Sequence, residues 1–234
     1  LSRPWLHESA YFLSRASRGR MLTQGTTREE YMDAQDCLDM LRDIRDVTFA
    51  TVGEDGLPQA RIIDVMLGER GRLWVCTARG KEFYAQLMHS SHGAITGLSK
   101  DWRSVRLSGV VRRADDASQR AWIDRIFDEN PSMCGVYPGD SRYILEAFCI
   151  EEGTIELFDL GHEPIFRQGF SLGGAVPHAS GFAIGDDCIG CGLCARGCPQ
   201  QCVEKGSPYA IEQEHCLHCG RCFERCPVQA IRRR

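Results

Sequence analysis

The sequence lacks several features that mark large classes of protein. It contains no run of about eighteen apolar residues, the minimum for a helix that crosses a bilayer, so we expect no membrane span. Its formal net charge is only −4, so we expect no nucleic-acid partner. We find no secretory signal, and the thirteen cysteines are an odd number, so a disulfide framework is not expected. With 43% hydrophobic residues, the chain can nevertheless build a sizeable core and a small module.

Cysteine is abundant only towards the C-terminus, where two quartets have the spacing C-x2-C-x2-C-x3-C-P. The quartets are Cys188, Cys191, Cys194 and Cys198, then Cys216, Cys219, Cys222 and Cys226. In such a run three thiolates serve one iron–sulfur cluster and the fourth serves a second cluster. The sequence therefore predicts two [4Fe-4S] clusters, the first held by Cys188, Cys191, Cys194 and Cys226 and the second by Cys216, Cys219, Cys222 and Cys198. Thiolates around iron need a reducing interior, so we expect a cytoplasmic protein.

A shift of 28 positions superimposes the two quartets, which makes the segment an internal repeat. The same shift brings a ninth thiol, Cys202, onto Ala230, so we interpret Cys202 as small core packing. Zinc is the alternative metal for these cysteines, but zinc sites use two C-x2-C pairs separated by a longer gap. The segment resembles the bacterial two-cluster ferredoxins over nearly its whole length.

The remaining chain predicts a mainly β fold with some α-helix. We assign residues 1–27 to an N-terminal arm, 28–172 to a barrel domain, 173–185 to a linker and 186–234 to the ferredoxin-like module. Thr27 and Glu30 have the spacing of a capping box for a first helix. Expected strands cover residues 47–52, 59–67, 72–77, 93–99, 102–114, 143–150, 154–160 and 165–170, with helices at 81–89 and 116–129. Strands 143–150 and 154–160 are expected to form a hairpin across Glu152-Gly153. So many short strands suggest a closed antiparallel barrel.

Within residues 28–172 a series of short motifs resembles the pyridoxamine 5′-phosphate oxidase-related flavin split barrels. They are Phe49-Ala50-Thr51-Val52, Asp55-Gly56-x-Pro58, Arg61-Ile62-Ile63, Leu73-Trp74-Val75-Cys76-Thr77, Lys81 and Val105-Arg106-Leu107-Ser108-Gly109. The resemblance implies a six-stranded Greek-key barrel that forms a homodimer and binds FMN at the subunit interface.

The residue chemistry agrees with an FMN site. Thr77, Ala78, Arg79 and Lys81 lie where a predicted strand passes into a helix, and a helix N-terminus with a hydroxyl and cations suits a phosphate. Arg61 matches the family's other phosphate-binding arginine. By the same resemblance Ile62, Ile63 and Asp64 would lie along the isoalloxazine edge. The alternative is that Arg61 and Lys81 are ordinary surface charges.

Two functions remain open at this point. The first is an oxidoreductase in which an external donor, a ferredoxin or a reductase, feeds the clusters, which reduce FMN, which reduces a small organic substrate. The second is a non-enzymatic electron carrier that serves a protein partner. Vitamin B6 oxidases carry an Arg-x-His segment that we do not find after Leu160, so that reaction is not expected. Tyr84, His89 and Tyr137 are available as proton donors, and nothing distinguishes them.

Overall fold

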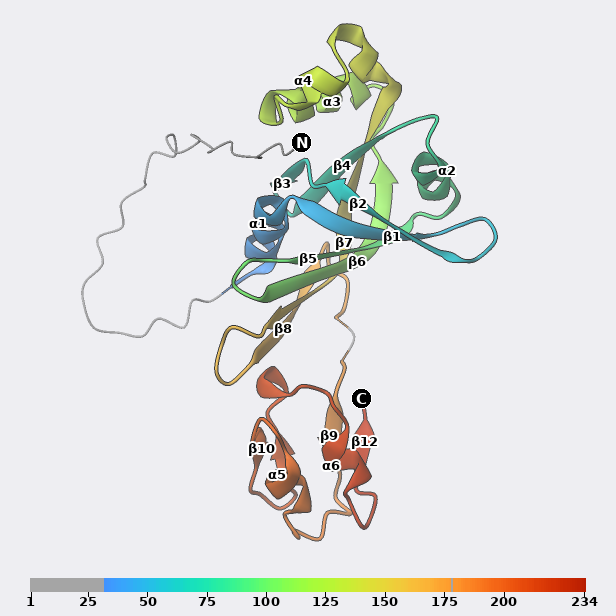
Figure 1. The fold of residues 1–234 in the computed structure, drawn as a ribbon. Helices are drawn as coiled ribbons and strands as arrows, with labels where there is room; N and C mark the ends of the chain where they lie inside the picture. Colours follow the sequence, from blue (N-terminus) through green and yellow to red (C-terminus); the bar gives the residue numbers. More distant parts are fainter. Residues whose placement is uncertain (1–31, 178) are drawn as a thin grey trace, which may run out of the picture. The chain divides into compact units, whose positions relative to one another are not determined.

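The computed structural model describes residues 32–177 and 179–234. In the first range, eight strands form one antiparallel sheet that curls on itself (Figure 1). The order of the strands is β2-β1-β5-β6-β7-β4-β3, and β8 also pairs with β7. The strands are β1 (Asp46–Val52), β2 (Pro58–Asp64), β3 (Leu67–Glu69), β4 (Arg72–Ala78), β5 (His92–Leu98), β6 (Arg103–Arg113), β7 (Leu145–Asp159) and β8 (Phe166–Leu172).

The two ends of this sheet meet through the chain itself. β2 and β3 lie at opposite ends of the strand order, yet only Val65 and Met66 separate them, and both residues are buried. The Val65 amide donates to the Arg45 carbonyl at 2.9 Å and the Met66 amide donates to the Trp74 carbonyl at 2.8 Å. A flat sheet cannot bring its outer strands within two residues of each other, so the sheet must curl into a barrel here. The predicted mainly β barrel is confirmed, although the predicted strand 59–67 is interrupted at this corner.

The first helix begins later than predicted. Helix α1 (Ala34–Ile44) has Asp33 as its N-cap. The Asp33 carboxylate accepts from the Asp36 amide at 3.0 Å, and the Asp36 carboxylate accepts from the Asp33 amide at 2.8 Å. This reciprocal pair is a capping box at the start of α1. The predicted arm and the predicted cap residues Thr27 and Glu30 lie outside the described residues.

The predicted hairpin across Glu152-Gly153 is wrong, because both of its strands belong to the single 15-residue strand β7. Gly153 faces Gly109 of β6, and a β-bulge shifts the register nearby. A Cβ at Gly153 would lie 2.3 Å from the Ser108 carbonyl oxygen, and a Cβ at Gly109 would lie 2.2 Å from the Glu152 oxygen. These glycines therefore allow two backbones to approach closely, which is a different use of glycine from a turn.

Buried side chains lie on both faces of the first half of β7. On one face Phe148 and Ile150 join the barrel core around Phe49. On the other face Ala147 and Cys149 join a second cluster beneath helix α3 (Gln119–Glu129). This double coverage explains why Leu145–Ile150 is a continuous buried run. The remaining helices of this region are α2 (Glu82–His89), α4 (Met133–Val136) and the 3₁₀ helix η1 (Gly139–Ile144).

The C-terminal module consists of two similar halves. Its elements are β9 (Phe182–Ile184), α5 (Leu193–Gly197), β10 (Val203–Glu204), β11 (Ala210–Ile211), the 3₁₀ helix η2 (Gln213–His215), α6 (Arg221–Glu224) and β12 (Ile231–Arg233). β9 pairs with β12, and β10 pairs with β11. The first strand of each half thus pairs with the last strand of the other half. β9 falls within the stretch that was assigned to the linker.

Among the described residues, no helix is long and apolar enough to cross a bilayer.

Candidate cofactor sites

The eight quartet cysteines line two separate cavities in the C-terminal module. One cavity is lined by Cys188, Cys191, Cys194 and Cys226, together with apolar residues that include Ile184 and Ile231. The other is lined by Cys198, Cys216, Cys219 and Cys222, together with Phe182 and Ile211. Each cavity therefore brings together three cysteines of one quartet and the last cysteine of the other.

The backbone around the two cavities repeats at the same spacing of 28 residues. Gly192 and Gly220 precede α5 and α6 with φ of 69° and 80°. Gln201 and Gln229 follow the last cysteine of each quartet with φ of 54° and 53°. A positive φ is uncommon for a residue other than glycine. Its recurrence at equivalent glutamines shows that the two halves share one loop geometry.

Backbone amides point at the sulfur atoms. The His218 amide donates to the Cys216 Sγ at 3.4 Å, and the Ala230 amide donates to the Cys226 Sγ at 3.3 Å. Hydrogen bonds from the backbone amides of Tyr209 and Gly190 lower the pKa of the Cys188 thiol. Donors of this kind stabilise thiolates, which are the form that binds iron.

The ninth thiol lies beside the second cavity. Cys202 is 2% exposed, its Sγ lies 3.5 Å from the Cys198 Sγ, and it helps to line the cavity. A hydrogen bond with the Cys202 thiol lowers the pKa of Cys216 to about 6, and the same contact raises the pKa of Cys202. The Cys202 Sγ is therefore in contact with a quartet sulfur of its own cavity.

The thiols are arranged for a cluster and not for a single ion. Within residues 32–177 and 179–234, no three histidine, cysteine or acidic side chains converge as a mononuclear site requires. The quartets instead lie around the walls of their cavities. In a [4Fe-4S] cluster each of the four irons binds a different thiolate, so the thiolates are spread around the cluster. In a zinc site, by contrast, all four ligands surround one ion, with Zn–S distances of about 2.3 Å. The residues present therefore fit two [4Fe-4S] clusters.

A second candidate site lies where β4 passes into α2. Thr77 is 3% exposed, and its Oγ1 has no hydrogen-bond partner in the described part of the chain. Ala78 ends β4, and Lys81 is the N-cap of α2 with an exposed side chain. The first amides of a helix lack partners within the helix and attract anions. A buried orphan hydroxyl and a cation at a helix N-terminus are suited to hold a phosphate.

Arg61 of β2 reaches the same helix. Its guanidinium donates to Gln86 Oε1 at 2.6 Å and to Thr51 Oγ1 at 2.7 Å, and it lies 4.7 Å above the centre of the Phe83 ring. Burial lowers the pKa of Arg61, because desolvation disfavours the charged form. Both hydrogen-bond acceptors are neutral. A partly buried cation of this kind is well suited to bind an anion.

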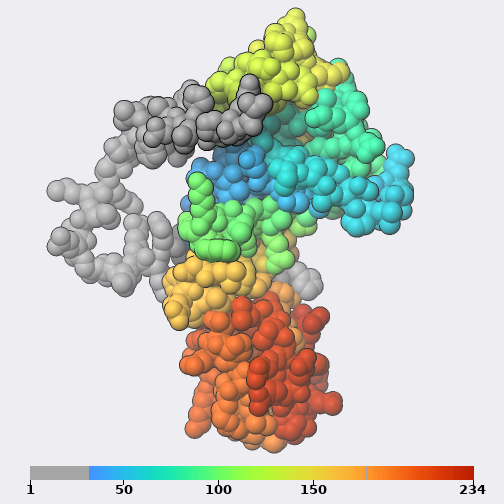
Figure 2. Space-filling view, viewed as in Figure 1, coloured from blue at the N-terminus to red at the C-terminus, as the bar shows by residue number. Residues whose placement is uncertain are grey.

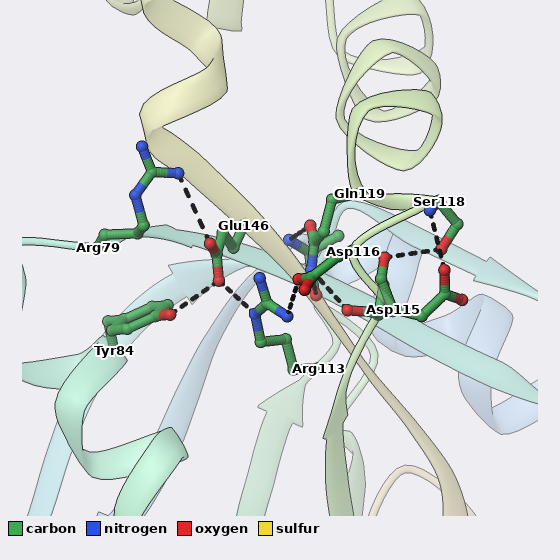
Figure 3. A network of polar contacts seen from close by, with 10 residues as sticks. Arg79, Tyr84, Arg113, Asp115, Asp116, Ser118, Gln119 and Glu146 are labelled. Atoms are coloured by element: carbon green, nitrogen blue, oxygen red, sulfur yellow. Dashed lines mark hydrogen bonds and ion pairs between the residues drawn. The ribbon is translucent and has the colours of Figure 1, made fainter.

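Arg79 has different contacts from those expected for a phosphate ligand. Its guanidinium donates to the Tyr143 carbonyl at 2.9 Å and lies 3.6 Å from the Glu146 carboxylate. Figure 3 shows Arg79, Tyr84 and Arg113 pointing at Glu146 from three sides. Glu146 is 6% exposed, and its pKa is lowered chiefly by the Arg113 hydrogen bond. Arg79 thus ties the strand–helix junction to β7.

The other predicted residues occupy the β2 edge. Ile62 is 65% exposed on the outer face of the barrel, and Ile63 packs against the core. Asp64 pairs with Arg45 at 3.3 Å. Of the possible proton donors, Tyr84 is hydrogen-bonded to Glu146 at 2.9 Å, and its pKa is raised mainly by burial.

Sequence reasoning missed Gln86, the role of Thr51 as a partner of Arg61, and Glu146. Glu146 carried a usable signal, because a lone acid inside the apolar run Leu145–Ile150 must be paired when it is buried. Gln86 carried none, since its contact depends on how α2 lies across β1 and β2.

Comparison with known families accounts for both regions. Residues 34–141 match the family model of pyridoxamine 5′-phosphate oxidase, and residues 187–230 match that of the 4Fe-4S dicluster domain. The chain joins a pyridoxamine 5′-phosphate oxidase-related domain to a 4Fe-4S dicluster domain. Both resemblances expected from the sequence are confirmed, and so are the two [4Fe-4S] clusters. The oxidase-related domain supports FMN as the second cofactor.

Solved structures resemble the oxidase-related domain. A NimC/NimA family protein from Clostridium acetobutylicum is 20% identical, with a TM-score of 0.51 over 59% of this chain and 93% of its own, and shows the same fold. A heme-binding protein from Mycobacterium smegmatis is 16% identical over 60% of this chain and 58% of its own, with a TM-score of 0.47. An FMN-binding protein related to pyridoxamine 5′-phosphate oxidase, from Nostoc punctiforme, is 15% identical over 59% of this chain and 92% of its own, with a TM-score of 0.40. No curated protein matches the sequence.

Proposed function

We propose that the protein is a flavin- and iron–sulfur-dependent oxidoreductase. It takes electrons from an external low-potential donor, a ferredoxin or a reductase, and delivers them through two clusters and FMN to a small organic substrate. The observation that carries this proposal is the pair of four-cysteine cavities on the same chain as an oxidase-related domain. Thiolates at iron require a reducing compartment, so we place the protein in the cytoplasm.

The dicluster domain contributes two sets of ligands. Cys188, Cys191, Cys194 and Cys226 hold one cluster, and Cys198, Cys216, Cys219 and Cys222 hold the other. This assignment is supported by the cysteines that line each cavity. Because each half supplies one ligand to the cluster of the other half, neither half can be loaded without the other in place.

The oxidase-related domain contributes the flavin site. Thr77 Oγ1, the Lys81 ammonium, the first amides of α2 and the Arg61 guanidinium bind the FMN phosphate. The backbone of Ala78 belongs to the same turn, and Arg79 connects this turn to Glu146 of β7 and Tyr143 of η1. The backbone of Ile62, Ile63 and Asp64 would contact the isoalloxazine ring, as the family resemblance implies.

Clusters transfer one electron at a time, whereas FMN accepts electrons singly and can release two together. Joining both cofactors in one chain therefore suits the conversion of single electrons from a donor into two-electron reduction of a substrate. The protein's own part is to bind both cofactors and to keep water from the phosphate site, where Thr77 is nearly inaccessible.

The active form is a homodimer with the flavin at the interface. This proposal is supported by apolar side chains that are exposed on the outer face of the barrel. Ile62 is 65% exposed, Leu98 is 54% exposed, and Leu57 in the β1–β2 turn is 59% exposed. The β1–β2 hairpin also projects from the barrel surface (Figure 2). Exposed apolar side chains around a free sheet edge are typical of a surface that another subunit covers.

The flavin site is tested by replacing its cations. The double variant Arg61→Ala with Lys81→Ala should lose bound FMN while it keeps all of its iron, because the phosphate loses both charged partners. Flavin and iron are measured on the same anaerobically purified sample. A matched control removes two exposed cations of the same domain, Lys100→Ala with Arg120→Ala, and should keep both cofactors. Equal flavin content in the two double variants would contradict the proposed phosphate site.

A further inference from the structure

The ninth thiol distinguishes two cavities that are otherwise equivalent. Cys202 lines the cavity of Cys198 and Cys216, and its Sγ lies 3.5 Å from the Cys198 Sγ. At the equivalent position of the repeat, 28 residues further on, the chain has Ala230. Ala230 is also 2% exposed, and it does not line the other cavity. Only one of the two cavities therefore has an S–H group beside its ligands.

Core packing alone does not account for this thiol. Both positions are equally buried, so a small side chain satisfies the packing, as Ala230 does in the second half. Cys202 is not a fifth ligand, because its cavity already contains four cysteines in the same arrangement as the other cavity. Nor is it part of a disulfide, since 3.5 Å is far longer than an S–S bond of about 2.05 Å. The remaining property of the side chain is that it can donate a hydrogen bond to sulfur.

We propose that the Cys202 thiol donates an S–H hydrogen bond to the ligand sulfur of Cys198. This bond raises the reduction potential of the adjacent cluster above that of the other cluster. The adjacent cluster is the one held by Cys198, Cys216, Cys219 and Cys222. The proposal rests on the ligand sets of the proposed function. Hydrogen bonds to sulfur are among the factors that set the potential of such clusters. Reduction adds one electron and makes or breaks no bond at Cys202, whose proton stays on its own sulfur throughout.

The physical reason is the extra negative charge of the reduced cluster. That charge spreads over the iron-bound sulfurs, so a donor in contact with one of them stabilises the reduced form more than the oxidised form. The contact is buried, where water competes least and the interaction is strongest. As a consequence, an electron that enters the dicluster domain rests first on the cluster beside Cys202.

The test measures both cluster potentials by anaerobic redox titration with electron paramagnetic resonance. Cys202→Ala should make the more easily reduced cluster harder to reduce, by about three- to tenfold in its equilibrium constant, or about 30–60 mV at 59 mV per tenfold for one electron. The other cluster should be unchanged. Cys202→Ser retains a hydrogen-bond donor and should keep most of the difference between the two cluster potentials. Ala230→Cys adds a thiol to the second half and should raise the potential of the other cluster.

The experiment separates a failure of the ligand sets from a failure of the role of Cys202. Iron content and the resonance signals of two clusters report the ligand sets, and the potentials report the role of Cys202. Cys202→Ala could leave both potentials unchanged, or lower both by the same number of millivolts, while eight irons per chain remain. In either case the tuning role is wrong and the ligand sets stand. If the wild-type chain never holds two clusters, the proposed function itself fails.

Discussion

Each of the two domains is stabilised by a different kind of internal contact. The oxidase-related domain buries two hydrophobic cores, one on each face of its sheet. In residues 186–234 the buried hydrophobic residues are only Cys202, Val203, Cys216, Ala230 and Ile231. Two of these five are cysteines beside a cavity. The contrast indicates that the barrel folds on its own core, whereas the dicluster domain depends on its cofactors, as small metal-binding modules commonly do.

Removing the iron should expose this difference most strongly. After anaerobic treatment with a chelator, amides of residues 186–234 should lose their protection against hydrogen exchange, because few buried contacts remain to hold that fold. Amides of β5, β6 and β7 should stay protected. Hydrogen exchange with mass spectrometry on the full chain reports both regions at once. Loss of protection in both domains together would contradict an independent barrel.

A change in the barrel backbone should produce the next largest effect. Gly153→Ala places a Cβ 2.3 Å from the Ser108 carbonyl oxygen, so β6 and β7 must separate, and we expect a loss of about 2–4 kcal/mol in the free energy of unfolding. Gly135→Ala is the matched control, because a Cβ there meets no atom within 4 Å. Urea unfolding followed by tryptophan fluorescence compares the two variants. Equal stabilities would show that the close approach at Gly153 is unimportant.

The Glu146 network should have a smaller and pH-dependent effect. Glu146→Gln should lower the free energy of unfolding by about 1–3 kcal/mol at pH 7, because Arg113 and Arg79 lose a buried carboxylate. Since the pKa of Glu146 is lowered from its usual 4.5, this contribution is present above pH 4.5 and disappears as pH falls through the lowered pKa. The gap between variant and wild type should therefore narrow in acid.

A control for that experiment lies on the same strand. Glu152 is half-exposed and pairs with Arg112 at 2.9 Å, so Glu152→Gln should change stability by less than about 1 kcal/mol at any pH. A difference between Glu146→Gln and wild type that stays constant from pH 7 down to about pH 2, below the lowered pKa, would contradict the charge-based account.

The same contrast explains how much the sequence could predict. In the dicluster domain the fold is dictated by cysteine spacing, so the crossed quartets could be inferred directly, and the structure lines its two cavities with those sets. In the barrel, strand positions followed from hydrophobic patterning, whereas Glu152-Gly153 resembled a turn. Only the pairing of Gly153 with Gly109 of a distant strand reveals its purpose.

The flavin site shows a second limit of sequence reasoning. Thr77 and Lys81 could be placed at a strand–helix junction because they are close together in the sequence. The partners of Arg79 and Arg61 could not, because Glu146 and Gln86 approach them through the folding of other elements. Which of several neighbouring cations is free to bind a phosphate is therefore decided by tertiary structure.

The central claim is that electrons pass from the clusters to the flavin within this protein. It is tested most directly by mixing the anaerobic protein, loaded with iron and FMN, with a reduced ferredoxin and following the loss of flavin absorbance. In the wild-type chain the flavin should be reduced. In Cys219→Ser, with its FMN content unchanged, that reduction should be almost abolished. Equally fast flavin reduction in both proteins would show that the clusters are not on the path.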